Sequence, residues 1–413
     1  MISRRSAVQL LAGTAIATGF GHAGAAFAAD KAVTIALDLS LTGADAESAK
    51  RVEYGALLAI DDANAKGGVA GYKIDVMPLD DGTATAGQYD PAQAATNARK
   101  MASDKAVVAS IGPQMSGAGK AMAPILSMAD LATITPSSTN PDITDPKFAA
   151  QYRPGGKAIY FRTVTTDAYQ GPNMANYYAE NLHVKSVFVL DDSGAYGVGL
   201  ADAFQAQAEK KGIKVLGRDR LDPKASDYAA ILTKIKSLNP DGLYYGGVLQ
   251  AGVKLIKQAY DILPHSMVKG GGDGLNGPEI LTAAGFPAAE GWYNTNASPH
   301  AMDDPKSQDF IKRYSAKFGV QPDDYAITAY TGAQVILAAI ESVAKSGKPV
   351  NRSNVRDAIQ ATKMDSLIGP VQFDANGDLV TKVVSIFQVK KDPAFPLDDL
   401  SNQNKYLGVA PES

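Results

Sequence analysis

"AVTIALDLS", residues 32–40, opens a pattern that decides the fold of this chain. Its apolar and β-branched residues predict a buried strand. Val52, Ala56 and Ile60 follow at the spacing of one helix face. The next apolar run is "YKIDVMPLDD", residues 72–81, which predicts a second strand. A strand, a helix and a strand in this order are typical of a βαβ unit with parallel strands, so the sequence indicates an α/β fold.

This alternation repeats along the chain and indicates two lobes, each a doubly wound parallel sheet. It stops at an irregular segment with several Pro and Gly residues, 141–157, and then starts again. A chain of 413 residues, of which 45% are hydrophobic, is long enough to bury two cores. Helices are predicted at residues 91–103, 168–182, 197–211, 228–237, 306–318, 324–344 and 351–361.

The order of the elements predicts three crossover segments between the two lobes. Beyond residue 296 the pattern becomes mostly helical, which is long enough to complete the first unit. Two strand-like segments then close the chain, and these would complete the second unit. We expect lobe 1 at residues 30–163 and 297–369 and lobe 2 at residues 164–296 and 370–413, with crossovers near 163, 296 and 370.

The N-terminus has the pattern of an export signal. Arg4 and Arg5 precede an apolar run of small residues, and an A-x-A cleavage motif ends at Ala28. The paired arginines are typical of twin-arginine export. An uncleaved membrane anchor is the alternative, but the run is rich in Gly and Ala and is interrupted by His22. We therefore expect residues 1–28 to be a twin-arginine-like signal peptide and the mature protein to lie in the periplasm.

Charge and composition narrow the class of partner. With 40 basic and 43 acidic residues the net charge is −3, which does not favour nucleic acid or an anionic membrane. The chain has no Cys, which excludes disulfides, thiol chemistry and a lipid-bearing Cys. His183, His265 and His300 are too scattered to indicate a metal cluster. We expect a small-molecule ligand and no cofactor or metal.

One glycine-rich motif has the form of a dinucleotide-binding loop. Residues 272–277 read GDGLNG, which matches G-x-G-x-x-G after a strand-like segment. Asp273 would place a negative charge among the backbone amides that bind pyrophosphate, and the motif lies far from a first strand-to-helix turn. An acidic residue in this loop suits a cation better. Residues 117–121, GAGKA, lack the Ser or Thr of a phosphate loop, and no G-x-S-x-G is present, so we expect no enzyme.

Hydroxyl side chains follow two successive strands. Ser116 comes after "VVASIG", and "TITPSSTNPDIT", residues 133–144, places Ser137, Ser138 and Thr139 after the next strand. These residues would cap the helices that follow. They would also be able to bind one carboxylate together, because loops from neighbouring parallel strands emerge at the same sheet edge. The residues alone leave both interpretations open.

Six blocks, taken in their order and spacing, resemble one known family over nearly the whole chain from Ala32 to Val389. The family is the periplasmic solute-binding proteins of the branched-chain amino acid type, the type I "flytrap" components of ABC importers. The blocks are "GALLAIDDANAKGGVAGYKIDV", "TITPSSTNPDIT", "DDSGAYGVGLADAF", "DYAAILTKIKSLNPDGLYYGG", "GGDGLNGPEI" and "IGPVQFDANGDL".

The resemblance implies two α/β lobes joined by three crossovers and no reaction performed. It implies that the ligand trapped between the lobes is an amino acid, branched-chain or related, or a related carboxylate. It also implies delivery of the ligand to the permease and ATPase subunits of an importer by a monomeric protein. Two alternatives stay open: a ligand that is a carboxylic acid or amide without an amine, such as an aromatic acid, and a role as a ligand sensor.

The resemblance also implies which residues bind an amino acid. Ser116 and Thr139 match residues that hold the α-carboxylate, with Ser138 beside them in the same turn. Ser137 matches a position whose carbonyl accepts from the α-ammonium. Asp273 matches the acid that pairs with that ammonium from the other lobe, and Tyr196 matches an aromatic residue that closes over the ligand.

Two further positions of the implied site depart from the family pattern. Ser48 and Val248 stand where leucine-type members carry tyrosines. The small disulfide of the family is also missing. The resemblance therefore implies an intact amino-acid end of the site but leaves the selectivity for the ligand side chain open.

Overall fold

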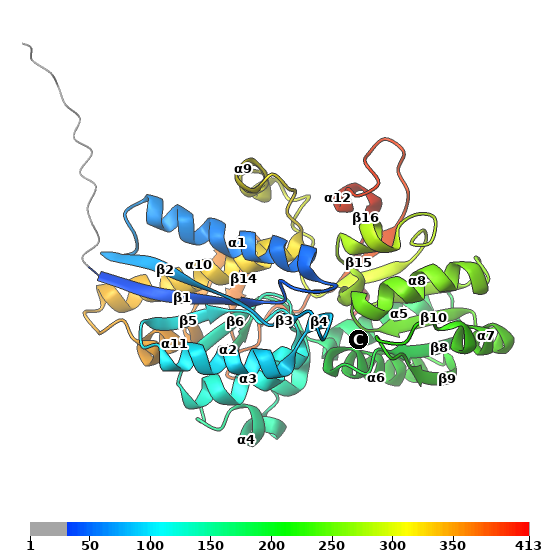
Figure 1. Ribbon diagram of the computed structural model, residues 1–413, viewed down its shortest axis with the longest axis horizontal. Coiled ribbons are helices and arrows are strands. Elements are labelled where there is room, and N and C mark those ends of the chain that lie inside the picture. The colour runs from blue at the N-terminus through cyan, green and yellow to red at the C-terminus, as the bar shows by residue number, and fades with distance from the viewer. Residues whose placement is uncertain (1–30, 413) are drawn as a thin grey trace, which may run out of the picture.

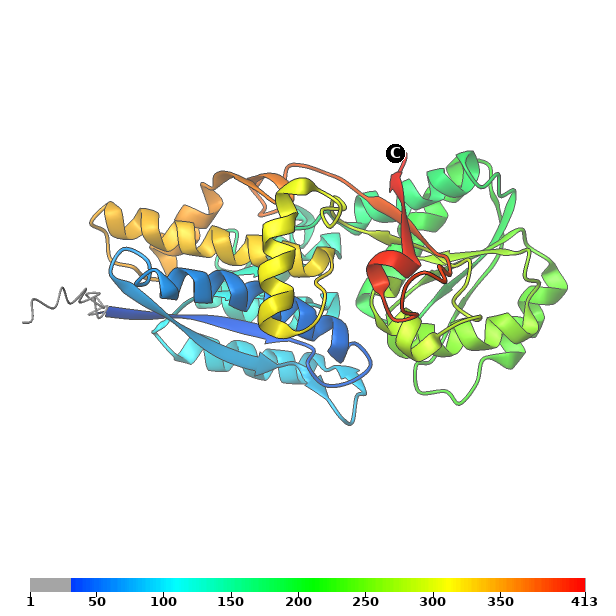
Figure 2. The same cartoon turned by 90° about the horizontal axis from the view of Figure 1, so that it is seen from above.

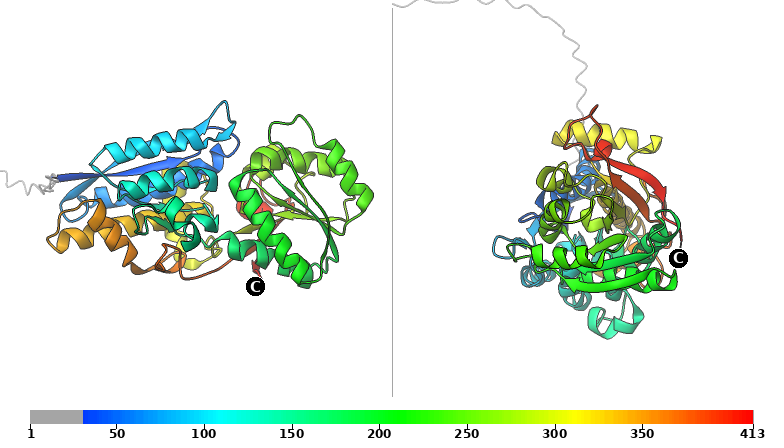
Figure 3. Two further views of the ribbon diagram at one scale, coloured as in Figure 1. Left: turned by 90° about the horizontal axis from the view of Figure 1, so that it is seen from below. Right: turned by 90° about the vertical axis from the view of Figure 1, so that its right-hand side faces the viewer.

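The computed structural model describes residues 31–412 as two lobes that lie side by side along the long axis of the molecule (Figure 1). The same separation is clear from above (Figure 2) and from below (Figure 3). The expected signal peptide, residues 1–28, lies outside the described residues.

Lobe 1 is built on a parallel sheet whose strands, in their order across the sheet, are β2 (Tyr72–Asp80), β1 (Lys31–Leu39), β5 (Val107–Ile111), β6 (Ala132–Thr135) and β7 (Tyr160–Arg162). Helices cover both faces of this sheet, as the doubly wound pattern predicts. The helices of lobe 1 are α1 (Ala46–Ala65), α2 (Pro91–Ser103), α3 (Ser116–Met128), α4 (Ala149–Tyr152), α9 (Gln308–Phe318), α10 (Asp324–Lys345) and α11 (Arg352–Gln360).

Helix α10 is central to lobe 1. It is the one helix among residues 31–412 that is long and apolar enough to cross a membrane, but 78% of its apolar window is buried inside the protein. It packs along α1 on one face of the sheet, so it is a core helix (Figure 1). The Asp323 side chain accepts from the amide of Ala326 at 2.8 Å and fixes where the helix begins. This start places Tyr325 in the first turn, next to lobe 2.

Lobe 2 is built on a larger sheet whose strands, in order, are β16 (Asn404–Val409), β15 (Ser385–Val389), β12 (Tyr293–Asn296), β11 (Val268–Gly271), β10 (Gly242–Gly246), β8 (Ser186–Asp191) and β9 (Lys214–Arg220). The last five are parallel, whereas β15 and β16 extend the edge in antiparallel directions. The helices of lobe 2 are α5 (Asp167–Glu180), α6 (Ala195–Lys210), α7 (Ala229–Leu238), α8 (Leu249–Ile262) and α12 (Leu400–Gln403).

The chain passes between the lobes three times, after β7, after β12 and again before β15. The third passage is predicted near residue 370, but in the structure it lies later in the chain. The reason is a hairpin of β13 (Lys363–Ser366) and β14 (Gly369–Gln372). Phe373 and Leu379 pack with the core of lobe 1, and Val384 is the next residue buried with lobe 2, so the passage lies between 379 and 384. Two short strands, β3 (Gly82–Thr83) and β4 (Gln88–Tyr89), form a second hairpin beside the cleft.

Candidate functional site

A cavity with about 500 Å³ of space outside the protein atoms lies between the two lobes. Its walls come from the carboxyl ends of strands in both sheets, where α/β proteins bind their ligands. Ser116 follows β5 and Ser137 follows β6 in lobe 1. Tyr196 follows β8 and Asp273 follows β11 in lobe 2.

The eight residues predicted for the site fall into two groups. Six of them line the cavity, and two, Ser138 and Thr139, do not. Both of these side chains are buried, at 1% and 0% exposed, behind the turn that carries Ser137. Their predicted contact with a ligand stays a prediction. The six residues that line the cavity are Ser48, Ser116, Ser137, Tyr196, Val248 and Asp273.

The two hydroxyl turns of lobe 1 are fastened together. Ser116 is the first residue of α3 rather than its N-cap, which is Met115. The Ser116 hydroxyl oxygen accepts from the amide of Asn140 at 3.2 Å and lies 3.3 Å from the Ser138 hydroxyl, which donates to it. The Ser137 hydroxyl donates to the carbonyl of Gln114 at 3.0 Å. These bonds bring the two turns to one side of the cavity, beside the first amides of α3, which have no acceptor inside the helix.

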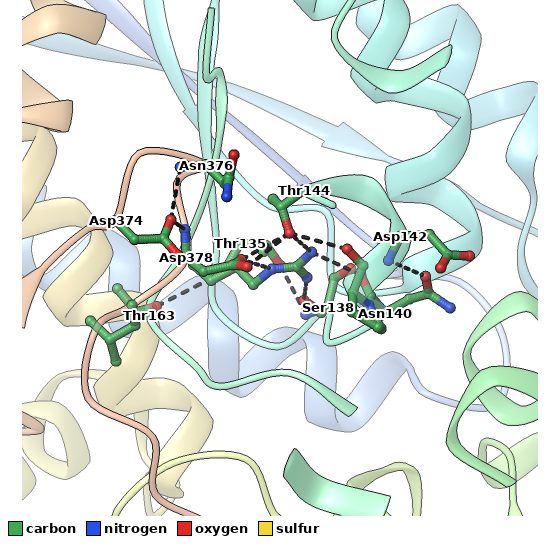
Figure 4. A network of polar contacts seen from close by, with 12 residues as sticks. Thr135, Ser138, Asn140, Asp142, Thr144, Thr163, Asp374, Asn376 and Asp378 are labelled. Carbon is green, nitrogen blue, oxygen red and sulfur yellow. Dashed lines mark hydrogen bonds and ion pairs between the residues drawn. The ribbon is translucent and has the colours of Figure 1, made fainter. Parts of the chain in front are cut away.

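A network of polar contacts that includes Ser138, Asn140 and Asp378 holds the second turn in place (Figure 4). The Arg162 side chain is fully buried and donates to the carbonyls of Ser138 and Asn140. It also donates to the Thr144 hydroxyl at 3.1 Å and forms an ion pair with Asp378 at 2.7 Å. Asp378 precedes the third passage between the lobes, so this network joins the cleft turn to a connecting segment. Nothing in the local sequence around Arg162 indicates this role.

Asp273 from lobe 2 is held by donors from both lobes. Its Oδ1 accepts from the Tyr196 hydroxyl at 2.5 Å and from Gln170 Nε2 at 3.0 Å. Its Oδ2 accepts from the hydroxyl of Tyr325, which begins α10 in lobe 1. The Asp273 side chain therefore lies at the boundary of the two lobes and at the wall of the cavity.

Two neighbouring carboxyl groups share this environment. Burial raises the pKa of Asp273, and hydrogen bonds from Tyr196, Tyr325 and Gln170 act in the opposite direction. Burial, followed by the charge of Asp273, raises the pKa of Asp167 to about 8. Because Asp273 has the fuller set of donors, we assign the negative charge to Asp273 and the proton to Asp167 near neutral pH. A cationic group in the cavity would therefore meet a charged Asp273.

The lobes also contact each other directly around the cavity. The amide of Ser48 in lobe 1 donates to Glu279 Oε1 in lobe 2 at 2.9 Å. Asn140 Nδ2 of lobe 1 donates to the carbonyl of Ala195 in lobe 2 at 2.8 Å. These bonds form only when the lobes lie close together, so the structure is a closed form.

Several residues in and beside the cavity are not predicted from the sequence. Tyr325, Gln170 and Glu279 act through partners that are far away in the sequence: 52 residues separate Tyr325 from Asp273, and 231 separate Ser48 from Glu279. Asp45 and Gln114 line the cavity directly. The only signal for these two is their position in loops that follow strands of lobe 1.

A family model described as periplasmic binding protein matches residues 32–394. The chain belongs to this family. It is 32% identical over 382 residues to a Leu/Ile/Val-binding protein homolog of Brucella melitensis, with 92% of this chain and 97% of the relative covered. Its fold is similar to the crystal structure of a leucine-binding protein from Thermotoga maritima, at 26% identity and a TM-score of 0.78 over 92% of this chain and 98% of the other.

A solute-binding protein from R. palustris in complex with benzoate has the same fold, with a TM-score of 0.75 at 21% identity over 92% of this chain and 97% of that one. These findings confirm the predicted resemblance to branched-chain amino-acid-type periplasmic binding proteins and the predicted fold class. The family consists of solute-binding proteins and not of enzymes.

Proposed function

We propose that this protein is the periplasmic solute-binding component of an ABC importer and that it binds an amino acid between its lobes. The observation that supports this proposal most directly is the opposition of two kinds of group across one cavity. Ser116 and Ser137, with the amino end of α3, lie on the lobe 1 side. The buried carboxylate of Asp273 lies on the lobe 2 side.

The two sides suit the two charged ends of a zwitterion. The hydroxyl of Ser116 and the first amides of α3 are donors for an α-carboxylate, and the helix end carries a partial positive charge. Asp273 is an acceptor for an α-ammonium, because its Oδ2 accepts from Tyr325 alone and has room for a second donor. The proposed role of Thr139 is to hold the α-carboxylate with Ser116, and its buried hydroxyl oxygen has no hydrogen-bond partner among the described residues. Ser138 supports this group by donating to the Ser116 hydroxyl.

The binding energy and the closing of the lobes follow from the same contacts. Charge-assisted hydrogen bonds contribute roughly 1.5–3 kcal/mol each, so three or four of them offset the cost of closure and reach the ~8 kcal/mol of a micromolar ligand. Because the contacts are divided between the lobes, the ligand binds the closed form better than an open form. In this proposal the closed, ligand-bound form docks on the permease and ATPase subunits. The protein acts as a monomer in the periplasm, after export and removal of the signal peptide near Ala28.

The test is a thermal-shift and calorimetry screen of the purified protein with amino acids, small amides and aromatic acids. A ligand that binds the folded state raises the melting temperature. We expect amino acids to do so. Asp273→Ala should lower their affinity by about 3 kcal/mol or more, roughly a hundredfold, because it leaves a buried ammonium unpaired.

Asp261→Asn is the matched control, because Asp261 is an exposed acid on α8 outside the cavity. Its affinity for amino acids should equal that of the unaltered protein. If Asp273→Ala retained full affinity, the ammonium would be bound elsewhere. If only acids without an amine, such as benzoate, raised the melting temperature, the amino-acid proposal would be replaced by the aromatic-acid alternative.

A further inference from the structure

We propose that the cavity selects an amino acid whose side chain ends in a positively charged hydrogen-bond donor, an ammonium or a guanidinium, and that Asp45, Gln114 and Glu279 bind this group. The inference rests on the proposed function, since it assigns the side chain of the same amino acid. It concerns the end of the cavity that Ser48 and Val248 line.

Three buried acceptor oxygens at this end have no hydrogen-bond partner. They are Asp45 Oδ2, Gln114 Oε1 and Glu279 Oε2. Their side chains belong to residues that are 3%, 8% and 6% exposed, so water does not compensate them at the surface. Other buried polar atoms of the described residues also lack a partner, but these three lie together beside one cavity, where a ligand is able to supply the donors.

The three residues gather around Ser48. The Ser48 hydroxyl donates to the carbonyl of Asp45 at 2.9 Å and accepts from Gln114 Nε2 at 3.2 Å. The Ser48 amide donates to Glu279 Oε1 at 2.9 Å. These bonds leave one oxygen of each side chain without a donor: Asp45 Oδ2, Gln114 Oε1 and Glu279 Oε2. The Asp45 carboxyl has one hydrogen bond, from the backbone amide of Leu249.

This cluster faces the cavity. Asp45, Ser48 and Gln114 line it directly. Glu279 reaches it beside Gly277, another lining residue, because Glu279 Oε2 lies 2.8 Å from the place that a Cβ atom on Gly277 would occupy. The glycine thus leaves this oxygen open toward the cavity.

The acidic side chains of the cluster favour a cation, because a nearby positive charge would stabilise their ionised forms. Burial raises the pKa of Glu279 to about 8, with the Ser48 amide acting in the opposite direction and the charge of Asp45 adding to the rise. Burial also raises the pKa of Asp45 to about 7, against the Leu249 amide. The other charged groups that act on the two carboxyls are acidic as well, and no Lys or Arg contributes to either pKa shift. These further acids are Glu47, Asp81 and Asp192.

An apolar branched side chain at this end of the cavity would make binding less favourable. It would exclude water from three acceptors and provide no donor, which opposes binding. A guanidinium or ammonium instead offers several donors and neutralises the paired carboxyls. The side chain is therefore selected by charge and hydrogen bonding rather than by shape.

The decisive experiment is calorimetry with L-lysine and L-norleucine, which have the same carbon chain and differ in the terminal ammonium. L-arginine and L-leucine form a second pair. We expect each basic amino acid to bind at least about tenfold more tightly than its apolar partner. Glu279→Gln and Asp45→Asn should each remove about tenfold of the affinity for lysine and leave that for norleucine unchanged or higher, whereas Asp261→Asn should change neither.

The outcomes separate this inference from the proposed function. Binding of norleucine and leucine that equals or exceeds binding of lysine and arginine would overturn the inference and leave an amino-acid-binding protein. Binding of glutamine but of no basic amino acid would overturn it in favour of a neutral donor. Binding of no amino acid at all would overturn the proposed function itself. The lysine and norleucine comparison uses the unaltered protein, so it stands even if a variant fails to fold.

Discussion

The two ends of the cavity both contain buried carboxyl groups, but these groups differ in how many hydrogen bonds they accept. At one end Asp273 accepts three hydrogen bonds from side chains of both lobes. At the other end Glu279 accepts one, from Ser48, and the Asp45 carboxylate has a buried oxygen with none. A carboxylate with a full set of donors is already fixed in its charge and position. A carboxylate without them gains its donors only when something enters the cavity.

The largest effect is expected where the protein supplies all the donors, as in the network of Arg162. Arg162→Met would leave Asp378 and two backbone carbonyls without their donor, so it should lower the free energy of unfolding by about 3–5 kcal/mol. Urea denaturation measures this loss. Lys120→Met is a control, because the Lys120 ion pair with Asp142 is partly exposed and contributes about 0–1 kcal/mol. Equal losses in the two variants would show that burial of the Arg162 network does not matter.

At the poorly satisfied end we expect a dependence on pH instead. Burial raises the pKa of Glu279 to about 8 and that of Asp45 to about 7, so the folded form binds more protons than the unfolded chain between about pH 4.5 and 8. The sign follows: the free energy of unfolding should fall as pH rises from 5 to 8, because the unfolded chain releases the protons of these two carboxyls at lower pH than the folded form does.

Urea denaturation at the two pH values measures this slope, and Glu279→Gln should make it shallower because the amide does not titrate, whereas Asp45 and Asp167 still do. The slope would persist unchanged in this variant if other buried acids were responsible. A cationic ligand favours the ionised carboxyls, so its affinity should rise over the same pH window in which the stability of the free protein falls.

The smallest effect is expected for a single donor at the well-satisfied end. Tyr325→Phe removes the hydroxyl that donates to Asp273 across the lobe boundary, so it should cost about 1–2 kcal/mol in the free energy of unfolding. Tyr330→Phe on the same helix is a matched control, because the Tyr330 hydroxyl makes only a 3.4 Å contact with Arg313. In thermal denaturation the melting temperature of Tyr325→Phe should be lower than that of Tyr330→Phe. The reverse order would show that Asp273 does not depend on this donor.

The fold follows from the sequence to within small errors. Each predicted helix ends within about two residues of its position in the structure, since helix periodicity is a local signal and boundaries differ by that amount between assignments. The third passage between lobes is missed because "IGPVQFDANGDL" has the same strand pattern whichever lobe it joins. Its hairpin pairing and the burial of Phe373 decide that question, and these are tertiary contacts.

The site follows from the sequence only in part. Ser116 and Ser137 stand out because they follow successive parallel strands, whose ends meet at one sheet edge. The position of Asp273 on the facing lobe is implied only by the family resemblance. The row Ser137 to Thr139 looks like one set of ligands, but neighbouring side chains of an extended turn point to different sides, so only Ser137 reaches the cavity. Tyr325 and Glu279 carry no local pattern, because their partners are placed by the way the lobes meet.

The ion pair between Arg162 and Asp378 has a mechanical consequence. It joins the lobe 1 ends of two of the three segments that connect the lobes. Arg162 lies just before the first connecting segment, and Asp378 lies just before the third. A rotation of lobe 2 relative to lobe 1 therefore starts from two connections whose lobe 1 ends are held side by side. Arg162 also donates to the carbonyls of Ser138 and Asn140, so the turn beside the cleft is bonded to the same pair of connecting segments.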